Sequence, residues 1–150
     1  MKGFTLIEIL ISLAILAVVL TVALQAILSF RAVSSLNATG EQVVSFLSEA
    51  RNKTLASKSN TQYGIRFNLD RFIFFSGAVF ASSTPGNKEY LLARDVEISS
   101  IALAGGNKDA VFDRLTGETA GSGAITVRIK ADATRTRTVS ISSTGLVTIQ

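Results

Sequence analysis

The chain has 150 residues, of which 47% are hydrophobic, and its formal net charge is +4. It contains no cysteine and no histidine, which excludes disulfide frameworks, thiolate or imidazole metal sites, and catalysis by either side chain. The length suffices for one domain with a hydrophobic core, and the mild positive charge permits contact with anionic surfaces without requiring it.

The chain opens with an apolar run that carries one carboxylate near its start. Residues 9–28 are apolar except for Ser12, Thr21 and Gln25, and twenty helical residues span about 30 Å, the thickness of a hydrocarbon core. A charge such as Glu8 in this run is costly, by roughly 2.5–3.5 kcal/mol on insertion scales for a helix centre. We therefore expect a partner that compensates Glu8.

Three interpretations of this run compete: a membrane helix that stays on the protein, a secretory signal peptide, and a helix buried in a soluble core. Too little chain follows to wrap a helix that is apolar on all sides, which disfavours the third. A signal-peptide cleavage site needs small residues, which Thr21 with Ala23 provides only weakly, and a signal peptide has no use for Glu8. Lys2 orients the segment with its N-terminus in the cytoplasm.

The stretch that ends at the carboxylate carries a specific motif. Lys2-Gly3-Phe4-Thr5-Leu6-Ile7-Glu8 resembles the processing site of type IV pilins and of the pseudopilins of type II secretion. The resemblance implies that a prepilin peptidase cuts the Gly3–Phe4 bond on the cytoplasmic side and N-methylates Phe4. It also implies that Glu8 pairs with the terminal amine of a neighbouring subunit, so that two costly charges offset one another. The alternative is a lone carboxylate that snorkels to the headgroups.

One departure from the family concerns proline. Major pilins commonly carry a proline in the second half of this helix, where it bends or locally melts the helix. This chain has Gln25 there, and its single proline is Pro85. We therefore expect no kink.

The helix is expected to continue beyond the membrane as an amphipathic segment over residues 31–60. Its apolar positions recur at near-helical spacing and are Leu36, Val43, Leu47, Ala50 and Leu55. Polar residues such as Glu49 and Arg51 occupy the opposite face. The pattern weakens over residues 37–40, which predicts a soft joint there, and a cluster of serine and asparagine predicts a helix end near Ser57–Asn60.

After this helix the period of the apolar pattern changes to two. The alternation predicts strands over residues 63–69, 71–76, 89–93, 96–103, 110–113, 124–130, 138–142 and 147–149. Short strands separated by frequent turns are typical of antiparallel sheet. The predicted fold class is α+β: a long N-terminal helix, formed by a membrane half and an amphipathic half, packs on an antiparallel globular part over residues 61–150.

The C-terminal part sharpens the resemblance. The stretch Val111-Phe112-Asp113-Arg114-Leu115-Thr116-Gly117, the strands over residues 124–130 and 138–142, and Ser143-Thr144-Gly145-Leu146-Val147 look like the GspH/FimT branch of minor pseudopilins and minor pilins. This resemblance implies that the globular part is a β-sandwich on the long helix.

The sequence shows no constellation of catalytic or metal-binding residues. Aspartates at positions 70, 95, 109, 113 and 132 are scattered over turns, where they usually cap backbone groups, so we predict no metal and no cofactor. The glycines at 117, 121 and 123 lack the lysine of a phosphate loop. The phenylalanines between Phe67 and Phe80 fit a core better than a stacking platform for nucleic acid, with Phe74 and Phe75 on opposite sheet faces.

Four basic residues gather within ten positions near the C-terminus: Arg128, Lys130, Arg135 and Arg137. The alternation of side chains along the strands points Arg128 and Lys130 away from the core. It would point Arg135 and Arg137 toward the core, so we expect a turn or bulge around residues 131–134 that redirects these two to a hairpin tip. A cationic tip contacts DNA phosphates without sequence specificity, and FimT-type minor pilins resemble this in using C-terminal basic residues for DNA. The alternative is a solvated edge whose charges prevent strand-to-strand aggregation.

Together these features predict a non-enzymatic building block anchored in the inner membrane by a single helix. After removal of the leader, residues 1–3, the segment 4–30 is expected to join other pilins or pseudopilins, which makes the chain a minor subunit of a type II secretion pseudopilus or type IV pilus. Two alternatives stay open: a minor pilin that binds DNA for uptake, and a soluble binding domain exported by a signal peptide.

Overall fold

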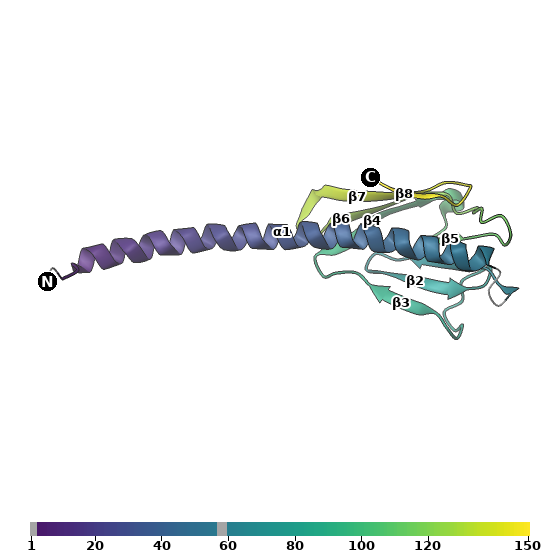
Figure 1. The fold of residues 1–150 in the computed structure, drawn as a ribbon, viewed down its shortest axis with the longest axis horizontal. Coiled ribbons are helices and arrows are strands. Elements are labelled where there is room, and N and C mark those ends of the chain that lie inside the picture. The colour runs from purple at the N-terminus through teal and green to yellow at the C-terminus, as the bar shows by residue number, and fades with distance from the viewer. Residues whose placement is uncertain (1–2, 57–59) are drawn as a thin grey trace.

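One long helix determines the shape of the molecule. The computed structural model describes residues 3–56 and 60–150. Helix α1 (Leu6–Leu55) runs along a globular part made of strands and projects far beyond it toward the N-terminus (Figure 1). This arrangement confirms the predicted α+β class. Lys2 and residues 57–59 of the expected helix end lie outside the described residues.

Local signals set the ends of α1. The backbone of Thr5 is extended, and its side-chain oxygen accepts a hydrogen bond from the Glu8 amide at 3.3 Å. This bond satisfies one of the amides that a helix start leaves without an intrahelical partner. The helix ends at Leu55, slightly before the expected position, and the amide of the C-cap residue Ala56 donates to the Asn52 carbonyl.

Helix α1 is continuous through residues 37–40, as expected, with no break at the predicted soft joint. Thr39 is only 3% exposed, and Gly40 is buried as well. A Cβ atom on Gly40 would stand 2.6 Å from Cδ1 of Ile149 near the C-terminus. The glycine therefore gives space for close packing, and the helix needs no flexibility there.

Two four-stranded antiparallel sheets form the globular part. The first has the order β3-β2-β1-β5, with β1 (Tyr63–Phe67), β2 (Arg71–Ser76), β3 (Lys88–Leu91) and β5 (Asp109–Val111). The second has the order β4-β6-β7-β8, with β4 (Val96–Leu103), β6 (Gly123–Ile129), β7 (Asp132–Ile141) and β8 (Val147–Ile149). A short 3-10 turn, η2 (Ala104–Gly106), follows β4. The strand predictions agree within a few residues except for β7, which begins at Asp132 instead of residue 138.

The hydrophobic core lies between the C-terminal half of α1 and both sheets. The helix contributes Leu36, Val43, Leu47 and Ala50, which confirms most of the predicted apolar stripe. The sheets contribute Ile65, Phe67, Phe72, Ile125, Val127 and Val139, among others. Because this burial is confined to the second half of the helix, the first half carries none of the globular part.

Phe74 and Phe75 point to opposite faces of the first sheet, as the alternation predicts. Phe74 belongs to the core beneath α1, where the Lys53 ammonium lies 4.8 Å from the centre of its ring. Phe75 is 1% exposed on the other face and packs edge-on against Phe80, with ring centres 5.4 Å apart. Both rings therefore serve packing, and neither forms an open stacking platform.

Candidate processing and assembly site on the N-terminal helix

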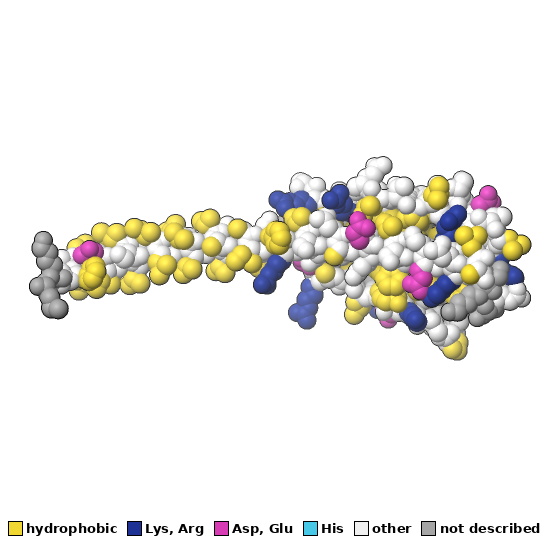
Figure 2. Space-filling view, in the orientation of Figure 1, with side chains coloured by type: hydrophobic (Ala, Val, Ile, Leu, Met, Phe, Trp, Pro, Cys, Tyr) yellow, Lys and Arg dark blue, Asp and Glu magenta, His cyan; other side chains and the backbone are white. Residues whose placement is uncertain are grey.

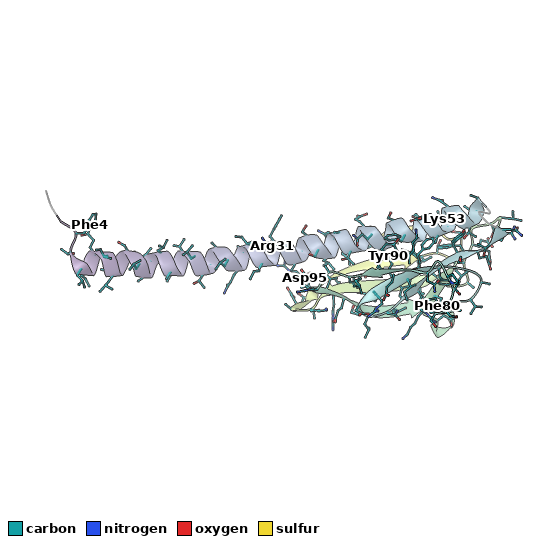
Figure 3. The ribbon with its side chains drawn as sticks, turned by 90° about the horizontal axis from the view of Figure 1, so that it is seen from below. Phe4, Arg31, Lys53, Phe80, Tyr90 and Asp95 are labelled. Carbon is teal, nitrogen blue, oxygen red and sulfur yellow. The ribbon has the colours of Figure 1, made fainter. Side chains whose placement is uncertain are left out.

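The Gly3–Phe4 bond lies free of the rest of the molecule. Phe4 is 79% exposed, and a Cβ atom built on Gly3 would meet nothing within 4 Å. The described structure therefore gives no packing reason for glycine at position 3 or for phenylalanine at position 4. Figure 3 shows Phe4 at the free end of the helix, far from the strands.

Glu8 occupies the third position of α1, directly above its cap. Thr5 and Glu8 have the spacing of a capping box, in which the side chain at the cap accepts from the amide three residues later. The partial positive charge at a helix N-terminus favours a carboxylate there. The carboxylate of Glu8 has no hydrogen-bond or ion-pair partner among the described residues. The position is electrostatically suitable for a carboxylate but leaves its charge free for an external partner.

The helix surface beyond Glu8 is apolar and uncovered. Every residue from Leu6 to Phe30 is exposed, and Figure 2 shows hydrophobic side chains on the visible face of this bare segment. Ser12 and Thr21 bond back to the carbonyls of Glu8 and Ala17, at 2.8 Å each. The hydroxyls are thus satisfied inside the helix, and the segment is long and apolar enough to cross a membrane.

The comparisons with known proteins agree on both parts of the chain. The family model described as "Prokaryotic N-terminal methylation motif" matches residues 1–24. No curated protein sequence matches the chain. Among solved structures, the minor pseudopilin EpsH from the type 2 secretion system of Vibrio cholerae is similar at a TM-score of 0.60 and 11% identity, covering 77% of this chain and 96% of that one.

A second solved structure, the type IV minor pilin FimU of Pseudomonas aeruginosa, is similar at a TM-score of 0.55 and 14% identity, covering 77% of this chain and 92% of that one. The chain carries the methylation motif and the fold of the type IV pilin family. This finding confirms the resemblance drawn from Gly3, Phe4 and Glu8. The exposed apolar helix of this pilin-like chain is consistent with anchoring of a prepilin in the inner membrane.

Each of the four basic residues proposed for DNA contact is bound to a group of its own chain. Arg128 pairs with Glu97 across neighbouring strands at 2.7 Å, and the Lys130 ammonium donates to the Arg94 carbonyl at 2.9 Å. Arg135 pairs with Asp132 at 3.2 Å. Arg137 donates from Nε to Oδ1 of Asn37 on α1 at 2.9 Å.

The expected bulge in this hairpin is present, but it does not move Arg137. Arg128 pairs with Thr136 while the next residue, Ile129, pairs with Asp132, so residues 133–135 are extra on β7. Beyond the bulge, Arg137 lies opposite the buried Val127, and its side chain stays on the face of the sheet that is turned toward α1. The prediction that it is redirected to the tip is therefore wrong.

The sequence interpretation missed Arg51, which joins α1 to two loops of the pilin fold. Its Nε donates to the Gly117 carbonyl at 3.2 Å and its NH2 to the Thr144 carbonyl at 3.5 Å. The sequence shows glycines at 117 and 145, next to both contacts, and the structure gives them positive φ values in tight turns. Among the described residues, no group of three acidic side chains lies close enough to hold a metal ion.

Proposed function

We propose that this chain is a minor subunit of a pseudopilus or type IV pilus, matured by prepilin peptidase and assembled through α1. The observation that carries the proposal is the combination at the N-terminus: a methylation motif whose Gly3–Phe4 bond is fully accessible, followed by a bare apolar helix on a pilin fold. A helix exposed on all sides needs either lipid or other helices around it. A fibre subunit uses both in turn, which suggests a structural role instead of a catalytic one.

In this proposal the leader, residues 1–3, faces the cytoplasm and the globular part lies on the other side of the inner membrane. Lys2 puts a positive charge on the leader side, as cytoplasmic flanks have, while the cation Arg31 flanks the other end of the apolar run. The peptidase would cut after Gly3 and methylate the new terminus at Phe4. The structure supports such a reaction with an N-terminal segment that nothing in the described chain covers.

Glu8 would then act in assembly. Its carboxylate has no partner within the described chain, and cleavage creates a positive amine at Phe4 in every subunit. An ion pair between Glu8 and a neighbour's amine removes two unpaired charges from an apolar environment at once. This pairing would favour assembled helices over isolated ones in the membrane.

The mature N-terminus tests the proposal directly. Intact-mass measurement of the protein extracted from membranes should show loss of residues 1–3 and one added methyl group. A mature terminus near Leu24 or Ile27 would show a signal peptide instead and would overturn the proposal. Strain pairs with and without the prepilin peptidase provide the control, because the unprocessed mass should appear only when the peptidase is absent.

The likeness to EpsH and FimU supports either kind of fibre, since one belongs to a type 2 secretion system and the other is a type IV minor pilin. We place the pseudopilus first because EpsH is similar at a slightly higher TM-score, 0.60, than the two FimU structures, at 0.55 and 0.58. DNA contact through Arg128, Lys130, Arg135 and Arg137 stays a prediction. Arg128 is held by Glu97 and Arg137 by Asn37 on α1, so these two do not join Lys130 and Arg135 in one cationic tip, which does not favour DNA contact.

A further inference from the structure

The globular part begins at a defined position along α1, close to the end of the exposed apolar run. The turn between β6 and β7 lies beside α1, where Ala131 and Arg135 face Leu28 and Ala32 across a shallow groove. The last exposed large apolar side chain of the N-terminal run is Phe30, and the first cation after it is Arg31. The strands therefore begin at the height where the apolar run ends.

Four cations surround this junction: Arg31, Arg94, Lys130 and Arg135. We call this group the basal rim. Lys130 joins two of its elements, because its ammonium donates to the Arg94 carbonyl and its amide donates to the Asp95 carbonyl, each at 2.9 Å. Figure 3 shows Arg31 and Asp95 at this end of the strands, and Figure 2 shows dark blue side chains gathered where the bare helix enters the globular part.

The cations of the basal rim are only partly neutralised. The guanidinium groups of Arg31 and Arg94 have no partner among the described residues, and the Lys130 ammonium contacts only a carbonyl oxygen. Arg135 pairs with Asp132, and Asp95 is the other carboxylate of the rim. The nearby carboxylates Asp70 and Glu89 both bind Arg71, so this group adds one net negative charge close to Lys130. The basal rim therefore carries an excess of positive charge.

The height of the rim along α1 matches the surface of a bilayer. Residues 6–30 of a helix span about 37 Å, compared with roughly 30 Å of hydrocarbon core and 40–45 Å including both headgroup layers. If Leu6 lies near the inner boundary of the core, Leu28 lies in the opposite headgroup layer and Ala32 just beyond its outer edge. This placement rests on the membrane anchoring proposed above.

We propose that the basal rim binds anionic phospholipid headgroups of the leaflet from which α1 emerges. Clusters of lysine and arginine next to a membrane helix are attracted to anionic lipid over about one Debye length, roughly 8 Å at physiological ionic strength. The guanidinium groups of Arg31 and Arg94 donate to phosphate oxygens. The contact holds the globular part against the membrane until the subunit enters a fibre.

The test uses the full-length protein in lipid vesicles. The chain has no cysteine, so one fluorophore can be attached at Ala131→Cys in the rim. A second preparation carries the label at Ser143→Cys, beside the contacts of Arg51 and about 30 Å further along α1. A quencher on the lipid headgroups should quench the label at 131 several-fold more in vesicles with phosphatidylglycerol than in vesicles of phosphatidylcholine alone. The label at 143 should be unaffected by lipid charge.

A charge variant and its matched control show which residues are responsible. Arg94→Gln with Lys130→Gln should remove most of the difference between the two lipids. The control, Lys53→Gln with Arg114→Gln, removes the same amount of charge at the end of the molecule far from the rim. It should leave the difference in quenching between the two lipids unchanged. Raising the salt concentration should release the unmodified rim in the same way, so the result does not depend on a variant that folds poorly.

Three outcomes would overturn the inference. Equal quenching at 131 in both lipids, with the protein floating with its vesicles, would refute lipid binding and leave the anchoring intact. Protein that fails to float with the vesicles would refute the anchoring itself and the rim contact with it. Equal quenching at 131 in both lipids, together with a change in its fluorescence on addition of duplex DNA at low salt, would make the rim a nucleic-acid surface.

Discussion

The Nε of Arg51 on α1 donates a hydrogen bond to the carbonyl oxygen of Gly117 at 3.2 Å, across 66 positions of sequence. The same guanidinium reaches the Thr144 carbonyl. One side chain of the helix therefore holds the loop before β6 and the turn before β8 together, at the end of the molecule far from Phe4.

Replacing Arg51 by methionine should loosen this end of the fold. Arg51→Met keeps much of the apolar stem but leaves two carbonyl groups without their charged donor, and we expect a loss of about 1–2 kcal/mol. Thermal unfolding of the full chain in detergent, followed by circular dichroism, measures the effect. The control Arg114→Met changes an exposed arginine whose side chain has no partner among the described residues, and a loss as large as that of Arg51→Met would contradict the role given to Arg51.

Gly145→Ala should be more harmful than the same change at another turn glycine. Gly145 has a φ of 76°, and a Cβ atom there would stand 1.9 Å from the Gly117 carbonyl oxygen. Gly86 has a φ of 99° but meets nothing within 4 Å. Both variants incur the left-handed backbone cost of about 1–2 kcal/mol, and only Gly145→Ala adds a clash with backbone. Equal melting temperatures for the two variants would refute this packing argument.

Glu8→Leu should separate membrane insertion from assembly. The substitution removes the cost of a charge in lipid, so the chain should insert at least as well and be cleaved normally. Under the proposed pairing it leaves a neighbour's amine without its partner, so the variant should be depleted from fibres recovered by pull-down. Gln25→Leu is the control within the same helix and should have little effect. Normal incorporation of Glu8→Leu would refute the pairing.

Gly3→Ala should impair maturation without affecting the fold. No described atom lies near the new methyl group, so thermal unfolding should be unchanged. Glycine enters an enzyme cleft in an extended form that a side chain obstructs, and membranes should therefore accumulate the unprocessed chain on an immunoblot. Full processing of the variant would show that the peptidase does not require glycine at this position.

The pKa of Asp132 should lie below its usual range, because the Thr134 hydroxyl and amide donate to its carboxylate at 2.6 and 3.1 Å, with a further contribution from Arg135. A lowered pKa in the folded state means that this stabilisation is present above the unfolded pKa and is lost as pH falls through the folded one. Thr134→Val should raise the pKa of Asp132 toward the ordinary value in an NMR titration. An unchanged pKa would assign the shift to the backbone amide of residue 134 and to Arg135 instead of the hydroxyl.

Local patterns made most of this fold predictable. The apolar run, the cap at Thr5 and the motif from Gly3 to Glu8 lie within a few residues of one another, and period-two alternation located the strands. The contacts that were missed connect distant positions: Arg51 to Thr144 across 93 residues and Arg137 to Asn37 across 100. Gly40 was misread for the same reason, since glycine weakens a helix locally and the side chains that pack against it, Ile149 and Arg137, are distant in sequence.

Because α1 is continuous from the apolar run into the core, its phase sets the direction in which the globular part faces. An α-helix turns about 100° and rises about 1.5 Å with each residue. One alanine inserted between Phe30 and Leu36 would leave both halves of the helix intact yet swing the two sheets by more than a quarter turn around the helix axis. The length of this short segment therefore determines which strands a subunit presents to its neighbours.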